Sequence, residues 1–260
     1  MLHGKCALIT GSTQGLGLAA AKRFAAAGCN IVINGFGDQN EIDAARAAIE
    51  QKHGVRTIYC NADLAHVNEI EQMLAQSMES FGGVDILINN AVVRHASPVD
   101  DFPVEAWDRG LAVNLTAAFH TIRLALPGMR RRNWGRIVNV SSIYGLIGGV
   151  NRINYVTSKT ALIGMTRAVA LETRGHDITC NAVCPGTVET PVHLNTIEQM
   201  MAAESLSRAE AGQRFLASKQ PGGRFISAED VAGMMLFLCG PESRDITGAA
   251  LPIDGGWSIA

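Results

Sequence analysis

The sequence lacks an excess of charge of either sign, and this absence narrows the class of partner. It carries 22 Lys plus Arg against 24 Asp plus Glu, a net charge of −2. A nearly neutral chain has little long-range attraction for a polyanion, so we expect no nucleic-acid partner. The one basic run, residues 130–132, is short and typical of a solvated helix end.

Further absences exclude other classes of protein. No stretch approaches the roughly 20 apolar residues of a membrane span, and no signal-peptide pattern is visible, so no membrane partner is expected. Six cysteines lie scattered without a CxxC pair or a cluster of metal ligands. This usage favours reduced thiols, a cytoplasmic protein and no bound metal. No Pro/Ser-rich linker or repeat divides the 260 residues, so we expect one domain.

Apolar runs of strand length alternate with longer stretches of helical period. The expected strands are residues 5–10, 30–35, 55–60, 85–89, 136–140, 178–184 and 249–253, and the expected helices are 16–27, 41–52, 68–80, 104–129, 153–173 and 228–238. The strands are continuously apolar, so both of their faces must be covered. This pattern predicts an α/β fold: a single doubly wound (Rossmann) domain over residues 1–260, with about seven parallel strands and helices on both faces. Residues 191–221 break the rhythm and are expected to form a substrate lid.

Glycine is abundant, with 27 residues, and its placement is informative. The first strand runs into a turn at residues 10–17 that contains Gly11, Gly15 and Gly17, and a helical pattern starts at once. Glycines at this point allow a tight turn, a close approach of the backbone to a pyrophosphate and close packing of helix on strand. The free N–H groups of the helix then face the phosphates. The turn therefore predicts a dinucleotide cofactor.

The end of the second strand bears on the choice of cofactor. It reads Asn34-Gly35-Phe36-Gly37-Asp38, with no acid at the strand tip and no Arg or Lys to hold a 2′-phosphate. The missing cation favours NAD over NADP, and Phe36 is placed to cover the adenosine. Asp63, after the third strand, is expected either to bond the adenine amino group or to cap the following helix.

A second group of residues predicts chemistry at the same edge of the sheet. Tyr155 and Lys159 are four apart in a helical stretch and so share one face. Ser142 follows the strand at 136–140, where ligands bind in open α/β sheets. Asn114 lies within the expected helix at 104–129, an unfavourable place for Asn that suggests a function.

In this order and at these spacings, the motifs resemble those of the short-chain dehydrogenase/reductase family over essentially the whole chain. The resemblance includes residues 10–17, Asn89-Asn90-Ala91, Asn114, Ser142, Tyr155 with Lys159, Pro185-Gly186 with Thr190, and Ile253-Asp254-Gly255-Gly256. The family has glycine where Val92 stands. We expect that departure to shift the backbone near the cofactor without removing a catalytic group.

The resemblance implies a division of roles. Tyr155 is the general acid/base on the substrate oxygen, and Ser142 hydrogen-bonds that oxygen. Lys159 binds the nicotinamide ribose and lowers the pKa of Tyr155, while Asn114 holds a water for proton relay. Thr190 and the Val188 backbone fix the carboxamide. The implied cofactor residues are Gly11, Thr13, Gly15, Leu16, Gly17, Phe36, Asp63, Leu64, Asn90, Tyr155, Lys159, Pro185, Gly186, Val188 and Thr190.

The required pKa change is large enough to restrict the environment of Tyr155. A free Tyr has a pKa near 10, so action near pH 7 asks for about 3 units, or roughly 4 kcal/mol. An exposed ion pair supplies about 1 kcal/mol or less. Lys159 must therefore act in a partly dry site, with the oxidised nicotinamide adding positive charge.

Within the family, segments such as Asn34-Gly35-Phe36-Gly37-Asp38 and Lys219-Gln220-Pro221 resemble bacterial D-3-hydroxybutyrate dehydrogenases. Those enzymes are NAD-dependent tetramers. The resemblance therefore implies NAD and a homotetramer, with the helices at 104–129 and 153–173 as packing surfaces.

The substrate pocket departs from that group. Where those enzymes hold a carboxylate with Gln, His and Lys, this chain has Arg94, Tyr144 and Arg152, and Thr187 replaces a pocket Trp. Arginine can hold a carboxylate through two hydrogen bonds, so an anionic substrate remains expected. The smaller Thr187 favours a hydroxy or keto acid larger than hydroxybutyrate. The expected substrate residues are Arg94, Ser142, Tyr144, Arg152, Tyr155 and Thr187.

Several alternatives stay open. Arg94 and Arg152 are otherwise surface or interface residues, and His95 and His193 either line the site or are ordinary surface histidines. A 3-oxoacyl-thioester or cyclic-ketone/alcohol reductase on the same scaffold is the second enzyme hypothesis. A non-enzymatic NAD sensor is disfavoured because all the residues expected to be catalytic are present.

Overall fold

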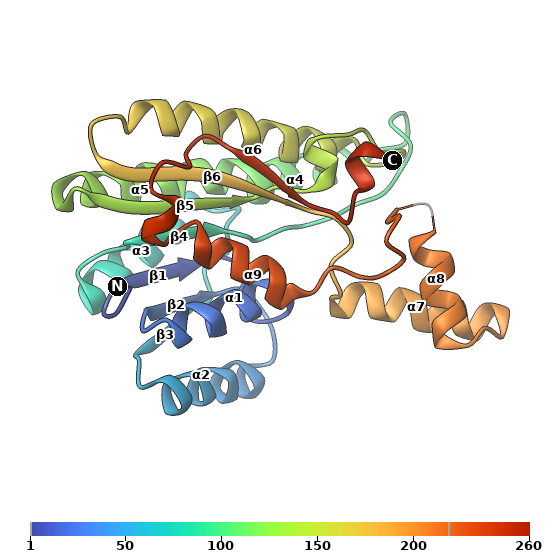
Figure 1. Ribbon diagram of the computed structural model, residues 1–260, viewed down its shortest axis with the longest axis horizontal. Coiled ribbons are helices and arrows are strands. Elements are labelled where there is room, and N and C mark those ends of the chain that lie inside the picture. Colours follow the sequence, from blue (N-terminus) through green and yellow to red (C-terminus); the bar gives the residue numbers. More distant parts are fainter. Residues whose placement is uncertain (1, 218) are drawn as a thin grey trace.

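The computed structural model describes residues 2–217 and 219–260, and its centre is a seven-stranded sheet in which every pairing is parallel (Figure 1). The strand order is β3-β2-β1-β4-β5-β6-β7. The strands are β1 (Cys6–Ile9), β2 (Asn30–Asn34), β3 (Thr57–Cys60), β4 (Ile86–Asn89), β5 (Trp134–Val140), β6 (Asp177–Pro185) and β7 (Ala250–Ile253). All seven expected strands are confirmed, each within two residues at either end.

Helices cover both faces of the sheet, as the continuously apolar strands predict. The helices are α1 (Gly15–Ala26), α2 (Gln39–His53), α3 (Val67–Phe81), α4 (Val104–Leu111), α5 (Ala117–Arg132), α6 (Ile153–Glu172), α7 (Pro191–Glu204), α8 (Arg208–Leu216) and α9 (Ala228–Phe237). One buried core joins α1, α2 and α9 to the sheet, and another joins α3, α5 and α6 to its opposite face. The expected single doubly wound domain is therefore confirmed.

The order in which strands are added to the sheet reverses at β1: β2 and β3 lie on one side of it, and β4 to β7 lie on the other. Leu8 lies between Val32 of β2 and Leu87 of β4. The connections after β1 and after β4 thus leave the sheet at neighbouring strand ends. In open α/β sheets a ligand crevice forms at this switch point.

A buried polar network fixes the two long helices on the central strands. The Asn89 amide donates to Asn139 Oδ1, and Asn139 Nδ2 in turn donates to Thr166 of α6, each at 2.9 Å. Thr121 of α5 donates to Asn89 Oδ1 at 2.7 Å. Since unsatisfied buried polar groups are costly, this network holds α6, which carries Tyr155, at one rotation about its axis.

The expected helix at 104–129 is not continuous, which corrects the prediction. A π-helical segment, Ala112–Thr116, separates α4 from α5. A π segment holds one extra residue per turn and so re-aims the side chains on it. Here it turns Asn114 inward, where the side chain is almost fully buried. The basic run at 130–132 ends α5, as expected, and Arg132 pairs with Asp85.

The segment expected to be a lid is a pair of helices set away from the sheet (Figure 1, orange). Ser205, in a left-handed conformation, ends α7, and a capping box between Ser207 and Glu210 starts α8. Residue 218, inside the expected lid, lies outside the described residues. Among the described helices, none combines the length and the apolarity needed to cross a membrane.

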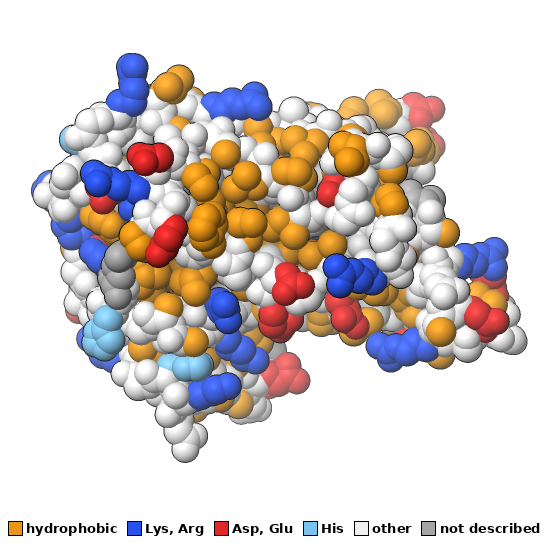
Figure 2. All heavy atoms as spheres, viewed as in Figure 1, with side chains coloured by type: hydrophobic (Ala, Val, Ile, Leu, Met, Phe, Trp, Pro, Cys, Tyr) orange, Lys and Arg blue, Asp and Glu red, His pale blue; other side chains and the backbone are white. Residues whose placement is uncertain are grey.

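Hydrophobic side chains gather on one exposed face over α9 and β7 (Figure 2). A second apolar set is exposed on α4, α5 and α6 at Val104, Phe119 and Leu171. Large apolar side chains in such positions mark surfaces that a partner can cover.

Candidate active site

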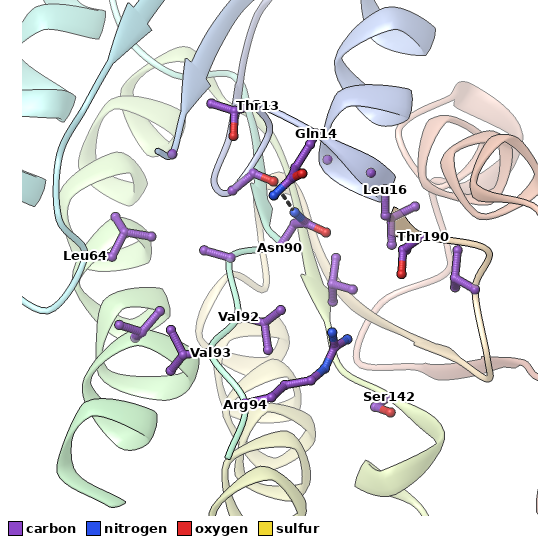
Figure 3. A pocket seen from close by; sticks show the side chains of 18 of the residues that line it. Thr13, Gln14, Leu16, Leu64, Asn90, Val92, Val93, Arg94, Ser142 and Thr190 are labelled. Carbon is purple, nitrogen blue, oxygen red and sulfur yellow. Dashed lines mark hydrogen bonds between the residues drawn. The ribbon is translucent and has the colours of Figure 1, made fainter. Parts of the chain in front are cut away.

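A cavity of about 400 Å³ lies along the carboxyl ends of the strands (Figure 3). Every residue that the sequence predicts to bind the cofactor lines it. Arg94 and Ser142, from the predicted substrate set, line it as well. The sequence therefore predicted which strand ends meet here.

The glycine turn fits a pyrophosphate. Gly11 and Gly15 have φ values of 62° and 55°, a region that L side chains rarely adopt. A Cβ on Gly17 would lie 2.2 Å from the Gly11 carbonyl oxygen. Gln14, at the N-cap of α1, makes no side-chain capping bond, so the first N–H groups of the helix remain free for an anion.

The amide of Asn90 holds this turn in place from the end of β4. Its Nδ2 donates to the carbonyls of Thr10 and Gly11, both at 2.9 Å, and Figure 3 draws the bond to Gly11 as a dashed line. Thr10 Oγ1 accepts from the backbone N–H groups of Asn90 and Ala91. Val92 lines the cavity without a positive φ, so this position does not require the conformational freedom of glycine.

The absence of an acid at the tip of β2 has a structural reason. The Asn34 amide is buried, and its Nδ2 donates to the carbonyls of Cys60 and Ala62 at 3.1 and 3.0 Å. Its Oδ1 accepts from the Gly11 N–H at 3.3 Å. A carboxylate could not donate these two bonds. The next residue but one, Phe36, is 59% exposed and lines the cavity.

Asp63 does not cap the following helix, because His66 is the N-cap of α3. The capping alternative is therefore wrong. One carboxylate oxygen of Asp63 accepts from the Ala65 N–H, and the other pairs with Arg109 at 2.9 Å. This pairing with Arg109 lowers the pKa of Asp63, although burial opposes the change. Arg109 was not foreseen; it lines the cavity from α4, where its sequence position carries no motif.

Tyr155, Lys159 and Ser142 meet at the inner end of the cavity. Tyr155 is the third residue of α6, so the positive end of the helix dipole favours its phenolate. Lys159, one turn later, is buried, and its Nζ donates to the Val140 carbonyl at 2.7 Å. That Nζ lies 5.7 Å from the centroid of the Tyr155 ring.

The electrostatics of this group favour a reactive phenol. Burial raises the pKa of Tyr155, but the Arg94 guanidinium, the Lys159 ammonium and hydrogen bonds from Ser142 and Arg94 together bring it below its ordinary value. Burial lowers the pKa of Lys159, and the negative charge of an ionised Tyr155 opposes part of this lowering. A proton donor and acceptor with a lowered pKa suits general acid/base catalysis near neutral pH.

Asn114 supports this site from behind rather than lining it. Its Oδ1 accepts from the Val93 N–H at 2.8 Å and its Nδ2 donates to the Val93 carbonyl at 3.0 Å. The side chain therefore fixes the loop after β4, which forms one wall of the cavity. Its predicted water-holding role stays a prediction.

The predicted substrate residues divide into two groups. Arg94 reaches into the cavity from the loop after β4, toward the side where Ser142 and Thr190 lie (Figure 3). Tyr144, Arg152 and Thr187 do not line this cavity. They lie beside it, where the Tyr144 ring packs edge-on against Tyr155 with centroids 6.1 Å apart.

Thr187 and Arg152 lie in the same region outside the cavity. Thr187 is buried, and its N–H donates to Gln220. Burial lowers the pKa of His193 and of Lys219, and the charge of Arg152, at the N-cap of α6, lowers both further. Arg152 thus acts on residues of the 191–221 segment and does not line the cavity.

His193 is the clearest residue that sequence reasoning left undecided. It lines the cavity from α7, and its Nδ1 lies 2.6 Å from the Val188 carbonyl. Burial lowers its pKa, and the cations Arg94, Lys219 and Arg152 lower it further. His95, by contrast, is exposed and packs against Phe102.

Comparison with known proteins identifies the family. The short chain dehydrogenase model matches residues 5–201. The chain is 45% identical over 258 residues to a D-beta-hydroxybutyrate dehydrogenase of Cupriavidus necator, covering 99% of each. It is 41% identical to a D-beta-hydroxybutyrate dehydrogenase of Rhizobium meliloti, covering 98% of each.

A solved structure extends this likeness to three dimensions. The L-sorbose reductase of Gluconobacter frateurii, determined with NADPH and L-sorbose, superimposes with a TM-score of 0.95 at 29% identity. The match covers all of this chain and 98% of the reductase.

Proposed function

This chain belongs to the short chain dehydrogenase family and is a nicotinamide-dependent oxidoreductase of CH–OH groups; on that premise, we propose that it interconverts an anionic hydroxy acid and its keto acid with NAD. The observation that carries the proposal is the position of Tyr155. Its phenol lies with Lys159 and Ser142 at the inner end of a cavity that begins at the glycine turn. A proton-transfer group and a dinucleotide site therefore share one space.

The residues of the chain divide the work as follows. In oxidation Tyr155 takes the proton of the substrate hydroxyl, and in reduction it returns a proton to the same oxygen. Ser142 orients that oxygen by a hydrogen bond. Lys159 stabilises the phenolate from a buried position, where an ion pair is worth more than on the surface. A bound nicotinamide supplies the hydride acceptor or donor.

The glycine turn would hold the pyrophosphate, and Val188 and Thr190 would hold the carboxamide. NAD is favoured over NADP because residues 34–38, at the tip of β2, and the glycine turn contain no Lys or Arg. Thr13, whose hydroxyl donates to the Phe36 carbonyl at 2.8 Å, and Phe36 itself offer no cation to a 2′-phosphate. The one arginine in this part of the cavity, Arg109, is already paired with Asp63.

An acidic substrate is favoured by the charges beside Tyr155. Arg94 enters the cavity and pairs with no carboxylate in the described part of the chain. Arg152 and Lys219 add positive charge on the lid side. The relatives named above are D-beta-hydroxybutyrate dehydrogenases, which favours a hydroxy acid of that kind here.

We further propose a cytoplasmic homotetramer. The six cysteines are all free and buried, which suits a reducing compartment. The apolar faces over α9 with β7, and over α4, α5 and α6, are two separate surfaces. Two different twofold contacts of this kind suffice to build a closed tetramer.

The test measures reduction of NAD and of NADP with matched 3-hydroxy acids and uncharged secondary alcohols. We expect turnover of the acids with NAD, and a loss of about 10²–10⁴-fold in kcat for Tyr155→Phe with unchanged NADH affinity by fluorescence titration. A preference for the uncharged alcohols would overturn the anionic substrate. Full activity of Tyr155→Phe would overturn the proton-transfer role.

A further inference from the structure

Arg94 is placed to act on the catalytic tyrosine as well as on a substrate. Its guanidinium carbon lies 5.5 Å from the centroid of the Tyr155 ring, slightly closer than the Lys159 Nζ at 5.7 Å. Arg94 and Tyr155 line the same cavity, and the guanidinium charge lowers the pKa of Tyr155. The two cations approach the phenol from different elements, Arg94 from the loop after β4 and Lys159 from α6.

We propose that Arg94 stabilises the ionised form of Tyr155 in the free enzyme, and that a substrate carboxylate cancels this effect by pairing with Arg94, so that substrate charge controls the ionisation of the catalytic group. This inference rests on the proposed function, because it requires an anionic substrate. Arg94 would then be a positioning and tuning residue for the proton transfer.

The surroundings of Tyr155 support a control of this kind. Lys159 is buried and bonded to the Val140 carbonyl, so an incoming substrate cannot pair with it. Arg94 is exposed to the cavity and has no carboxylate partner among the described residues, so it can change partner. One cation is thus fixed and the other is exchangeable.

The groups that face Tyr155 from each neighbouring element are few. Ser142 after β5 gives a hydrogen bond, and Tyr144 packs against the ring. Behind Lys159, the Cys184 thiol of β6 has its pKa raised by burial and so stays neutral. On the lid side His193 has a lowered pKa and is neutral near pH 7. The charges that act on Tyr155 are therefore those of Arg94 and Lys159.

The consequence has a definite sign in each direction of the reaction. Without substrate, Arg94 lowers the pKa of Tyr155 and favours the phenolate that oxidation requires. When a carboxylate neutralises Arg94, the pKa of Tyr155 rises, and the phenol holds its proton more tightly. The phenolate is then a stronger base toward a hydroxy acid, and with a keto acid bound the phenol is protonated and so able to donate.

The experiment follows the ionisation of Tyr155 directly in the full-length protein without cofactor. The chain has only three tyrosines, so a phenolate absorbance titration corrected with Tyr155→Phe isolates the signal of interest. We expect Arg94→Gln to raise the pKa of Tyr155 by about 1 unit, the low end for an opposite charge within 4–6 Å because Arg94 is exposed. Arg94→Lys should restore most of the lowering. Arg152→Gln, a cation beside the lid that does not act on Tyr155, is the matched control.

Propionate is the probe for the second half of the proposal. We expect it to raise the pKa of Tyr155 in the parent protein but not in Arg94→Gln, and propionamide to have no effect in either. An unchanged pKa in Arg94→Gln would overturn the proposal, as would an equal change in Arg152→Gln. A parent pKa that does not respond to saturating propionate would overturn the control by substrate charge.

The outcome is separable from that of the proposed function. The titration uses neither cofactor nor turnover, so it can fail while hydroxy acids are still oxidised. Conversely, a protein that oxidises only uncharged alcohols can still show the Arg94 effect. In active protein, the pH dependence of kcat/KM should move to higher pH in Arg94→Gln more than that of kcat does.

Discussion

Replacing Asn34 with aspartate would give β2 the acidic tip that commonly accompanies NAD binding. The structure predicts that this change destabilises the protein instead. Asn34 is buried and donates two hydrogen bonds, to the carbonyls of Cys60 and Ala62. An aspartate at this place would either hold a negative charge against two carbonyl oxygens or take up a proton.

The size of the destabilisation follows from the state of lower free energy, which is the protonated side chain. Protonating an Asp of ordinary pKa 3.9 costs about 4 kcal/mol at pH 7 but only about 1.5 kcal/mol at pH 5. The protonated side chain still lacks one of the two donors, which costs about 1 kcal/mol more. The folded-state pKa of the new carboxyl is raised, so the folded state holds a proton that the unfolded state releases, and stability falls as the pH rises above about 4. We expect Asn34→Asp to lose about 4–5 kcal/mol at pH 7 and about 2–3 kcal/mol at pH 5.

The assay is urea unfolding followed by circular dichroism at both pH values and one protein concentration. Asn34→Ala is the control, because it removes the same donors without adding a titratable group. Its loss of about 2–3 kcal/mol should be equal at the two pH values. If Asn34→Asp were as stable as the parent, or lost the same amount at pH 5 and pH 7, the proposed reason for the missing acid would be refuted.

Two further predictions concern the walls of the cavity. Gly17→Ala places a methyl group 2.2 Å from the Gly11 carbonyl oxygen. It should therefore weaken NADH binding, measured by fluorescence, at least about tenfold and lower the free energy of unfolding by about 1–3 kcal/mol. The control is Gly212→Ala on α8, where no atom lies within 4 Å of the new methyl group, and its NADH affinity and stability should stay near those of the parent. Asn114→Ala leaves the N–H and carbonyl of Val93 without their side-chain partners, so the melting temperature should fall by an amount equivalent to about 2 kcal/mol and kcat should drop. Unchanged kcat and melting temperature in Asn114→Ala would show that Val93 is held by other contacts.

Much of the fold was predictable because the sheet is buried on both faces. Continuous apolar runs such as residues 7–9 and 86–88 have no other stable place, and glycine at the ends of the helices sets their limits. The break in the helix at 104–129 was not predictable. A π segment differs from an α-helix by one residue in a turn, and nothing in the apolar spacing around Asn114 records it.

The cofactor half of the site was likewise predictable, since it is built from backbone and glycine at consecutive strand ends. The substrate half depends on where long side chains point, which local sequence does not determine. Arg94 enters the cavity while Arg152 lies near residues of the 191–221 segment, and the sequence around each arginine does not distinguish the two. The pairing of Arg109 with Asp63 joins residues 46 positions apart and had no local signal.

The π segment also constrains how this chain can change in length. Because this segment holds one extra residue in its turn, deleting one residue within Ala112–Thr116 would leave an ordinary α-helical turn between α4 and α5. The two helices would keep their places on the sheet, but the Asn114 side chain would turn away from Val93. A substitution here removes single contacts, whereas a one-residue deletion would remove the backbone geometry that directs Asn114 inward. A chain shortened in this way could therefore build the same sheet and helices without holding Val93 as this chain does.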